Sequence, residues 1–371
     1  SQYVVDNADL IIMREAMNLL CIRLANAIDA LAVFAMKWKD LPTLGYTHFQ
    51  PAQLTTVGKR ATLWAQDLVI DLEEIEYRSK TLKFRGVKGT TGTQASFLSL
   101  FEGNHDKCDQ LDRMITQRFA FDASFTVTGQ TYPRKVDAAI ICSLGGIAAS
   151  VHRFCNDIRL LAGLKQIEEP FEQEQVGSSA MAYKRNPMRC ERATGLARFV
   201  ISLVTSPLQT AAEQWLERTL DDSSNRRLTI PEPFLAIDGC LQIVINVARG
   251  LVVYPKTIEA AIMAELPFMV TEEILMAGVR GGGDRQALHE SIRRHSMAAA
   301  EQVKLHGQPN DLLQRLAKEP LLANVNLEKV LSPASHTGRA SQQVIEFENK
   351  VVTAIRQRYR NFFNGSATLS V

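Results

Sequence analysis

Long stretches of helical periodicity constrain the fold of this chain more than any other feature of its sequence. Across residues 10–36, apolar side chains recur at three- and four-residue spacing, and neither Pro nor Gly interrupts them. This spacing is typical of one amphipathic helix. At a rise of about 1.5 Å per residue, the helix would be about 40 Å long. The sequence therefore predicts a single long helix near the start of the chain.

Four further stretches show the same periodicity. They cover residues 63–82, 134–164, 187–216 and 225–252. The middle of the 134–164 stretch is apolar on nearly every face, as expected for a helix that other helices surround. Runs that alternate apolar and polar residues are almost missing. We therefore expect an all-α fold in which a long-helix bundle forms the core.

A change of pattern divides the chain into two parts. Its 371 residues exceed the roughly 250 to 300 residues that one hydrophobic core usually serves. Residues 251–256 read Leu-Val-Val-Tyr-Pro-Lys, and the helical patterns that follow are shorter and broken by Pro and Gly. We predict a central long-helix bundle domain over residues 1–253 and a smaller C-terminal all-α domain over residues 254–371.

Composition and charge exclude several classes of function. Hydrophobic residues make up 46% and charged residues 22%, which are ordinary values for a soluble globular protein. A formal net charge of +2 provides no general field for nucleic acid or an anionic membrane, so we expect no nucleic-acid partner. The longest apolar run, residues 138–151, is shorter than the roughly 18 residues of a membrane-spanning helix. We therefore expect no membrane partner.

The cysteines and the first residues suggest where the protein works and what surrounds it. The six cysteines form no CxxC pair, and most lie in apolar helical patterns, where Cys behaves as a small hydrophobic residue. This favours a reducing, cytoplasmic location. The sequence begins with Ser1 in place of Met and enters a helical pattern at once. We expect that an N-terminal region precedes it in related proteins.

Residues 177–189 carry polar side chains that core packing does not require. Their sequence is Gly-Ser-Ser-Ala-Met-Ala-Tyr-Lys-Arg-Asn-Pro-Met-Arg. Asn186 is a favourable N-cap and Pro187 a favoured first helical residue, so a helix is predicted to start there. The N-terminus of a helix binds anions, and Lys184 and Arg189 strengthen that preference. The segment predicts a carboxylate or phosphate site; the alternative is a solvated basic loop that only caps the helix.

This segment resembles the signature loop of the fumarase/aspartase superfamily. Its Ala-Met-x-Tyr-Lys-Arg-Asn-Pro-Met-Arg form is similar to the loop of the adenylosuccinate lyase family, and residues 41–51, 85–94 and 217–223 resemble that family too, the second of them its animal-type members. Ala182 stands where the family usually has Pro, which should loosen the loop. The resemblance covers essentially the whole chain. It implies a lyase that releases fumarate from a succinyl-substituted purine nucleotide.

The resemblance also implies catalytic roles for individual residues. Ser178 would be the general base, and His48 the proton donor to the leaving nitrogen, a task that suits an imidazole titrating near neutrality. Lys184 and Asn186 are expected to stabilise the negative charge that develops on the substrate carboxylate. Glu191 would orient His48. On composition alone, Ser178 would be a loop serine bonded to its own backbone and His48 a surface residue.

A second set of residues is implied to bind the substrate. Arg offers the planar fork that phosphate prefers, and several Arg residues surround the turn near residue 221. Arg226 is not counted among the nucleotide-binding residues, because it neighbours Arg227 and adjacent residues of a helix point to different faces. Ser1, Asn7 and Thr47 are implied contacts of the succinyl carboxylate, while residues 86–92 are either a carboxylate cradle or a simple turn. The implied nucleotide-binding residues are Gln130, Arg192, Arg218, Ser223 and Arg227.

Superfamily members pack the long helices of four subunits into one core, and each active site draws residues from three chains. The resemblance therefore implies a homotetramer with shared active sites. It implies no cofactor, and the seven histidines show no spacing typical of a metal site. Two alternatives stay open. One is another superfamily member such as a carboxymuconate cycloisomerase, against which Tyr183 and the arginines argue; the other is a non-catalytic structural or regulatory subunit.

Overall fold

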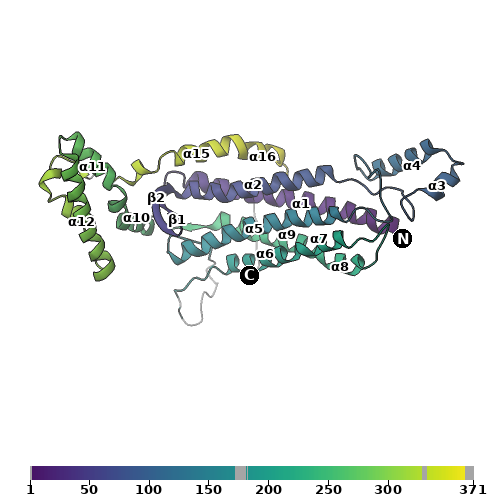
Figure 1. The fold of residues 1–371 in the computed structure, drawn as a ribbon, viewed down its shortest axis with the longest axis horizontal. Coiled ribbons are helices and arrows are strands. Elements are labelled where there is room, and N and C mark those ends of the chain that lie inside the picture. The colour runs from purple at the N-terminus through teal and green to yellow at the C-terminus, as the bar shows by residue number, and fades with distance from the viewer. Residues whose placement is uncertain (1, 172–180, 182, 328–331, 364–371) are drawn as a thin grey trace.

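The computed structural model describes residues 2–171, 181, 183–327 and 332–363. Long helices run side by side along most of its length and form an elongated bundle (Figure 1). The predicted all-α long-helix bundle is thereby confirmed. The five helices that build the bundle are α1 (Gln2–Lys37), α2 (Val57–Thr81), α5 (Lys135–Gly163), α6 (Met188–Leu203) and α9 (Pro231–Gly250).

A seven-residue repeat explains why α1 packs against both α2 and α9. Leu10, Met17, Leu24 and Leu31 are completely buried, and their spacing places them in one stripe on the helix. Met13, between two of these positions, is buried as well. An isolated helix would expose this stripe to water, so the stability of α1 comes chiefly from its neighbours.

Two of the predicted helices are interrupted. The stretch 187–216 contains α6 and α7 (Thr205–Ala212), and the stretch 225–252 contains α8 (Asp222–Thr229) and α9. Prolines lie in the first turns of α7 and α9, and Pro has no N–H with which to bond the preceding turn. Periodicity continued across both breaks, which is why the sequence predicted single helices there.

A β-hairpin joins α1 to α2 where the sequence predicted only a loop. Its strands are β1 (Pro42–Thr47) and β2 (Gln50–Thr56), and Thr47 pairs with Gln50. The sequence predicted a loop because Pro and Gly are uncommon within strands, and this segment contains both. A second, short antiparallel pair is formed by β3 (Ile167–Glu168) and β4 (Val252–Val253). It holds the end of α5 close to the end of α9.

Two helices extend from the end of the bundle opposite the β1–β2 hairpin, beyond the N-terminus of α1 (Figure 1). They are α3 (Ala95–Leu100) and α4 (His105–Arg118), and the sequence analysis did not predict them. The Asn104 side chain caps α4 by accepting a hydrogen bond from the Lys107 backbone N–H at 3.0 Å. These helices carry few buried side chains, so their periodicity is weak.

The predicted boundary near residue 254 remains a prediction. Helices α10 to α13 gather at the hairpin end, whereas α15 and α16 run back along α2 (Figure 1). Tyr359 donates a hydrogen bond to Glu76 of α2 at 2.6 Å, and Arg356 pairs with Asp29 of α1 at 2.6 Å.

The described part of the chain after residue 254 is built from helical elements. They are α10 (Pro255–Met269), α11 (Thr271–Arg280), α12 (Arg285–His306), α13 (Leu312–Leu316), 3₁₀ turns Pro320–Leu322 and Pro333–His336, α15 (Ala340–Phe347), a π turn Glu348–Val352 and α16 (Thr353–Arg358).

Three helical segments are long and apolar enough to cross a membrane, judged by length and composition alone. They are Gln2–Lys37, Lys135–Gly163 and Asp222–Gly250, and the apolar part of each is 67%, 56% and 50% buried within the chain. The expectation that no segment reaches this length is therefore wrong, because it counted only uninterrupted apolar runs. Packing among the helices accounts for at least half of this apolar character.

Asp71 on α2 is half-buried, and one of its carboxylate oxygens is buried without a hydrogen-bond partner. Burial raises the pKa of this carboxyl from its ordinary value of 3.8 to about 6, while the Ser150 hydroxyl lowers it. The folded protein thus holds the proton more tightly than the unfolded chain does, so Asp71 becomes increasingly destabilising as pH rises through the window from about 4 to about 6.

Replacing Asp71 by Asn is therefore expected to stabilise the protein at pH 7.5. The gain should be at most about 3 kcal/mol, because the pKa of Asp71 rises by about two units and each unit corresponds to about 1.4 kcal/mol. It should vanish below about pH 3, where Asp71 is protonated in both the folded and the unfolded state. Thermal unfolding of the parent and variant across this pH range measures the effect. Glu73→Gln, at an exposed position of the same helix, is the control; equal stability of parent and Asp71→Asn at pH 7.5 would contradict the prediction.

Candidate active site

The residues predicted for the active site lie in three groups along the bundle. One group surrounds α8, one lies at the tip of the β1–β2 hairpin, and one lies at the start of α6. Ser1 and Ser178 are outside the described residues. The geometry of each group decides what it can contribute.

The α8 group lines two neighbouring cavities. One, of about 630 Å³, is lined by Gln130 and Arg218. The other, of about 670 Å³, is lined by Arg218, Ser223 and Arg227. Arg218 contributes to both, so four of the predicted nucleotide-binding residues share one region. Its size and its cationic side chains suit a phosphorylated small molecule.

Backbone contacts fix Gln130 beside Arg218. The N–H of Gln130 donates to the carbonyl oxygen of Glu217 at 3.0 Å. A Cβ at Gly129 would lie 2.6 Å from that same oxygen, so only Gly permits the approach. The segment before α5 is thereby held against the turn that precedes α8.

The Gly86 to Gly92 loop reaches the smaller of these cavities, of about 630 Å³, through Gly89 and Thr90, which line it. Its first amides are already engaged: Gly86 N–H donates to Asn7 Oδ1 at 3.1 Å and Val87 N–H donates to Asp112 Oδ1 at 2.6 Å. Asn7, implied as a carboxylate contact, is buried and holds the loop instead. At this end the loop behaves as a structural turn.

The hairpin presents Thr47 and His48 to solvent at its tip. His48 and Phe49 form the two-residue turn, and both have positive φ, 54° and 57°, as a type I′ turn requires. Residues other than Gly rarely adopt this conformation. The hairpin thus holds an exposed imidazole in a strained turn, a combination more often found at functional positions than elsewhere. Within the described part of the chain, His48 has no hydrogen bond to Glu191.

The α6 group surrounds the end of the segment that includes Ser178. Lys184 and Arg192 are exposed and Asn186 is half-buried. Glu191, predicted to orient His48, instead lies 3.9 Å from Arg159. The helix starts at Met188, two residues after Asn186, with Pro187 at the N-cap position. Asn186 is therefore not the N-cap that the sequence predicted.

A carboxylate of the chain itself occupies the N-terminus of α6. Glu169 accepts hydrogen bonds from the backbone N–H groups of Arg189 and Cys190, each at 3.0 Å, and all three residues are buried. Two of the free amides at this helix end are therefore already used, so a substrate anion would have to be bound by the other groups of this segment. The carboxylate satisfies the free amides and complements the helix dipole. Glu169 had no motif to mark it, because its partners lie about twenty residues further along the chain.

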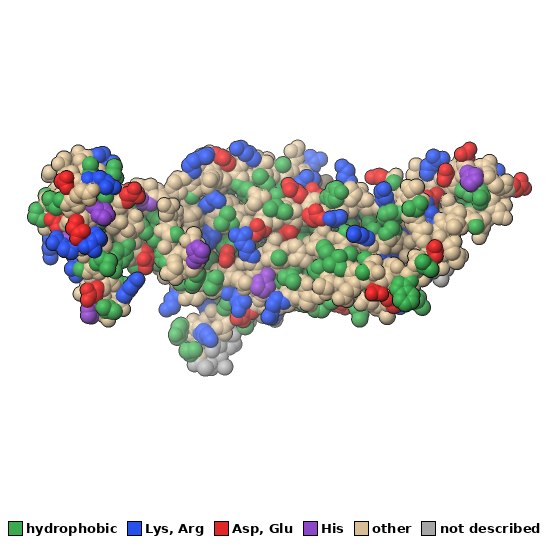
Figure 2. All heavy atoms as spheres, in the orientation of Figure 1, with side chains coloured by type: hydrophobic (Ala, Val, Ile, Leu, Met, Phe, Trp, Pro, Cys, Tyr) green, Lys and Arg blue, Asp and Glu red, His purple; other side chains and the backbone are tan. Residues whose placement is uncertain are grey.

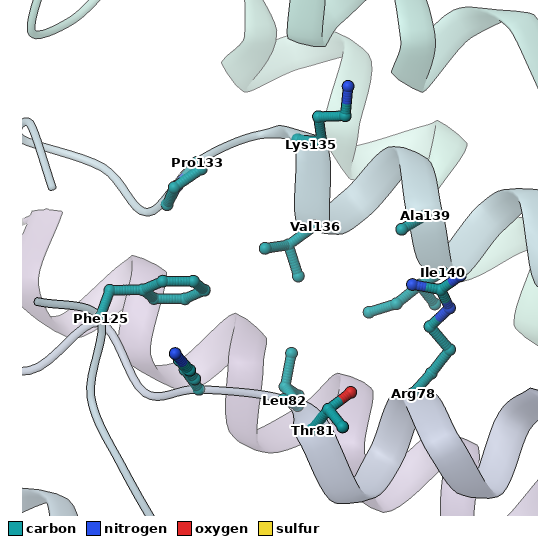
Figure 3. Close-up of a pocket in the computed structure, with 10 residues that line it drawn as sticks. Arg78, Thr81, Leu82, Phe125, Pro133, Lys135, Val136, Ala139 and Ile140 are labelled. Carbon is teal, nitrogen blue, oxygen red and sulfur yellow. The ribbon is translucent and has the colours of Figure 1, made fainter. Parts of the chain in front are cut away.

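A further cavity, of about 330 Å³, lies between the end of α2 and the start of α5. Figure 3 shows Phe125, Leu82 and Val136 facing into it, with Arg78 and Lys135 at its edges. None of the predicted site residues lines it. This cavity is separate from the candidate active site.

The α8 group lies far from the other two groups within one chain. Arg189 donates a hydrogen bond to Asn246 at 2.7 Å, and 19 residues of α8 and α9 separate Asn246 from Arg227, about 28 Å of helix. The hairpin follows α1, whose 36 residues span about 54 Å, while Gln2 at its other end lines both α8 cavities. One chain therefore does not assemble the predicted site.

Comparison with known proteins identifies the family. A lyase family model matches residues 1–202, and a model of the adenylosuccinate lyase C-terminus matches residues 267–347. Adenylosuccinate lyase of Saccharomyces cerevisiae is 52% identical over 366 residues, which cover 98% of this chain and 76% of the yeast protein. The chain belongs to the adenylosuccinate lyase family. The Schizosaccharomyces pombe and Schistosoma mansoni adenylosuccinate lyases are 52% and 48% identical, over 95% and 97% of this chain and 74% and 76% of their own lengths.

Solved structures confirm the fold of this adenylosuccinate lyase family member. A 3-carboxy-cis,cis-muconate lactonizing enzyme from Pseudomonas putida superposes with a TM-score of 0.78 at 20% identity, covering 97% of this chain and 76% of that enzyme. A fumarate lyase from Mesorhizobium superposes with a TM-score of 0.74 at 22% identity, covering 93% of this chain and 76% of that protein. Such identities establish the shared architecture alone. The much higher identity to adenylosuccinate lyases leaves the cycloisomerase alternative disfavoured.

Proposed function

We propose that the protein catalyses β-elimination of fumarate from adenylosuccinate, giving AMP. We extend the proposal to the related imidazole substrate SAICAR, which would give AICAR. The observation that carries it is 52% identity to an adenylosuccinate lyase across 98% of the chain, together with the arginine-lined cavities beside α8. A non-catalytic structural role is disfavoured because His48 and Lys184 are retained.

The elimination requires help at both ends of the bond that breaks. A proton leaves the carbon beside a carboxylate, the electron pair forms the new double bond, and the C–N bond breaks. His48 would protonate the departing nitrogen, and Ser178 would accept the carbon-bound proton. Lys184 and Asn186 would stabilise the extra charge on the carboxylate while it forms. Thr47, beside His48, and Ser1 would hold the succinyl group.

The nucleotide part would bind at α8. Arg218 and Arg227 supply guanidinium forks for the phosphate, and Ser223 supplies a hydroxyl from the same cavity. Gln130, held beside Arg218 by the backbone bond to Glu217, would contact the base or ribose. Arg192, which belongs to the α6 group, would add a positive charge at the same phosphate. This requires that α6 of one chain meets α8 of another.

We propose a homotetramer with active sites shared between subunits. Exposed apolar residues repeat every seven positions on α1 (Val5, Ile12, Leu19) and on α2 (Leu63, Ile70, Tyr77). Figure 2 shows apolar side chains between the charged ones along one face of the bundle. A heptad stripe packs against other helices, and monomers rarely expose such surfaces. Further copies of the chain would cover these stripes and bring a hairpin to an α8 cavity. We place this assembly in the cytoplasm, without a cofactor, a metal, nucleic acid or a membrane as partner.

An ultraviolet assay tests the proposed reaction. Purified protein is mixed with adenylosuccinate, the loss of the substituted purine is followed, and AMP and fumarate are quantified by chromatography. We expect the two products in equal amounts. A 3-carboxymuconate substrate serves as the comparison, and we expect no turnover of it. Turnover of the muconate alone, or of neither compound by a protein that light scattering shows to be a tetramer, would contradict the proposal.

A further inference from the structure

A buried ionic network lies directly behind the α8 cavities. It joins the first turns of α1 to the segment before α5 and to α8, three parts of the chain that are distant in sequence. Its acidic members are Asp6, Asp9, Asp137 and Asp222, and its other members are Tyr132, Arg134, Arg218 and Arg226.

Arg218 connects this network to the cavities. Its Nη1 donates to both carboxylate oxygens of Asp222, at 2.9 and 3.0 Å. Its Nε and Nη2 make no hydrogen bond within the described part of the chain, and its side chain is 16% exposed, whereas that of Asp222 is fully buried. One side of the guanidinium is therefore fixed, and its other donors remain available to a ligand in the cavities.

Asp222 is in turn held from behind. Arg134 Nε donates to Asp222 Oδ2 at 2.7 Å, and Arg134 Nη2 donates to Asp6 Oδ1 at 3.1 Å. The guanidinium of Arg134 also lies over the Tyr132 ring, 4.6 Å from its centroid. Because these side chains are fully buried, their electrostatic interactions are little screened by solvent. Asp222 therefore has one rigid position.

Arg226 belongs to the other half of the network and does not share the position of Arg218. Its Nε donates to Asp137 at 2.7 Å, and its Nη2 donates to Asp9 at 2.9 Å and to the Tyr132 hydroxyl. Burial raises the pKa of Tyr132 well above its ordinary value, so its hydroxyl stays protonated and donates to Asp137 at 2.6 Å. Arg226 also lines the 670 Å³ cavity, but its Nε and Nη2 are both used by the network. Arg218 lines both cavities, and among the described residues only its Nη1 takes part in the network.

We propose that Asp222 is a positioning residue: it fixes the guanidinium of Arg218 in the orientation that receives the nucleotide phosphate. This inference rests on the proposed function, because it takes the α8 cavities as the nucleotide site. Bonding by both oxygens to one nitrogen of Arg218 sets the direction of the remaining donors, which matters for a planar fork. A carboxylate that only stabilised the fold would act on all ligands equally.

A double-mutant cycle in the assembled enzyme separates these two roles. The variants are Asp222→Asn, Arg218→Lys and the pair together, with Asp221→Asn, at the adjacent exposed position, as control. We expect Asp222→Asn to raise KM and the AMP dissociation constant about tenfold while kcat changes less than about twofold, since about 1.4 kcal/mol corresponds to tenfold. Binding of adenosine, which lacks the phosphate, should not change. In the Arg218→Lys background, Asp222→Asn should have almost no further effect.

Three outcomes would overturn the role of Asp222. They are an equal loss of AMP and adenosine affinity, an additive effect in the cycle, and unchanged AMP affinity in a folded tetramer. If Asp222→Asn does not assemble, Asp222→Glu keeps the charge but displaces the carboxylate, and parental AMP affinity in that variant would also overturn the proposal. Calorimetry with AMP decides this even if the parent fails to cleave adenylosuccinate, a failure that would contradict only the proposed reaction.

Discussion

Replacing His48 by Ala is expected to lower kcat for adenylosuccinate by about 10³-fold, within the range of about 10²- to 10⁴-fold that a general acid contributes. The leaving nitrogen carries the electron pair of the broken C–N bond, and without a proton donor it departs as a poorly stabilised anion. KM should change little, because the nucleotide phosphate would be held by Arg218 and Arg227 on a different part of the bundle. Steady-state assays of parent and variant measure both constants.

His105→Ala provides the matched control for this prediction. His105 is exposed on α4 and is not among the residues that line the α8 cavities, so its replacement should leave kcat and KM unchanged. The His48 variant should still form a tetramer by light scattering, since the imidazole is exposed and contributes no side-chain hydrogen bond within the described residues. A His48→Ala enzyme that retains more than a tenth of the parental kcat would rule out His48 as the proton donor.

The long helices could be predicted because burial repeats in the sequence. In α1, the stripe that includes Leu10, Met17 and Leu24 is a local pattern, and the same residues are the ones that the fold buries. The hairpin could not be predicted this way. Its strands carry Pro42, Gly45 and Pro51, which indicate a loop when read alone, and the pairing that makes them strands is a tertiary result.

The candidate site could be predicted only in part, for a related reason. Motifs marked residues that face a ligand, such as Arg218 and His48. The residues that hold them carry no local signature: Glu169 caps a helix that begins 19 residues later, and Asp222 is fixed by Arg134, 88 residues away in sequence. The sequence also could not show the distance between the groups. That separation follows from the length of the helices and has a direct consequence for activity.

Mixing two variants that are each nearly inactive at low substrate concentration is expected to restore activity at that concentration. His48→Ala removes the proton donor at the hairpin, and Arg218→Gln removes a phosphate contact at α8, which lies about 50 Å away along the same chain, given the length of α1. If each site takes its hairpin and its α8 from different chains, some mixed tetramers contain sites in which both residues are intact. With random assembly from equal amounts, about one quarter of the sites should be intact. Activity of the co-expressed or dissociated and reassembled mixture measures this fraction.

Each variant assembled alone is the control and should stay inactive, because every site in it lacks the same residue. The parent mixed in equal amounts with His48→Ala should retain about half of the parental activity. Each site needs one hairpin, and half of the hairpins in the mixture carry an intact His48. A site built within a single chain makes a different prediction: two variants that are each inactive would give no activity in any ratio. Absence of restored activity in tetramers shown by mass spectrometry to contain both variants would therefore exclude shared sites, and with them the proposed arrangement of hairpin and α8.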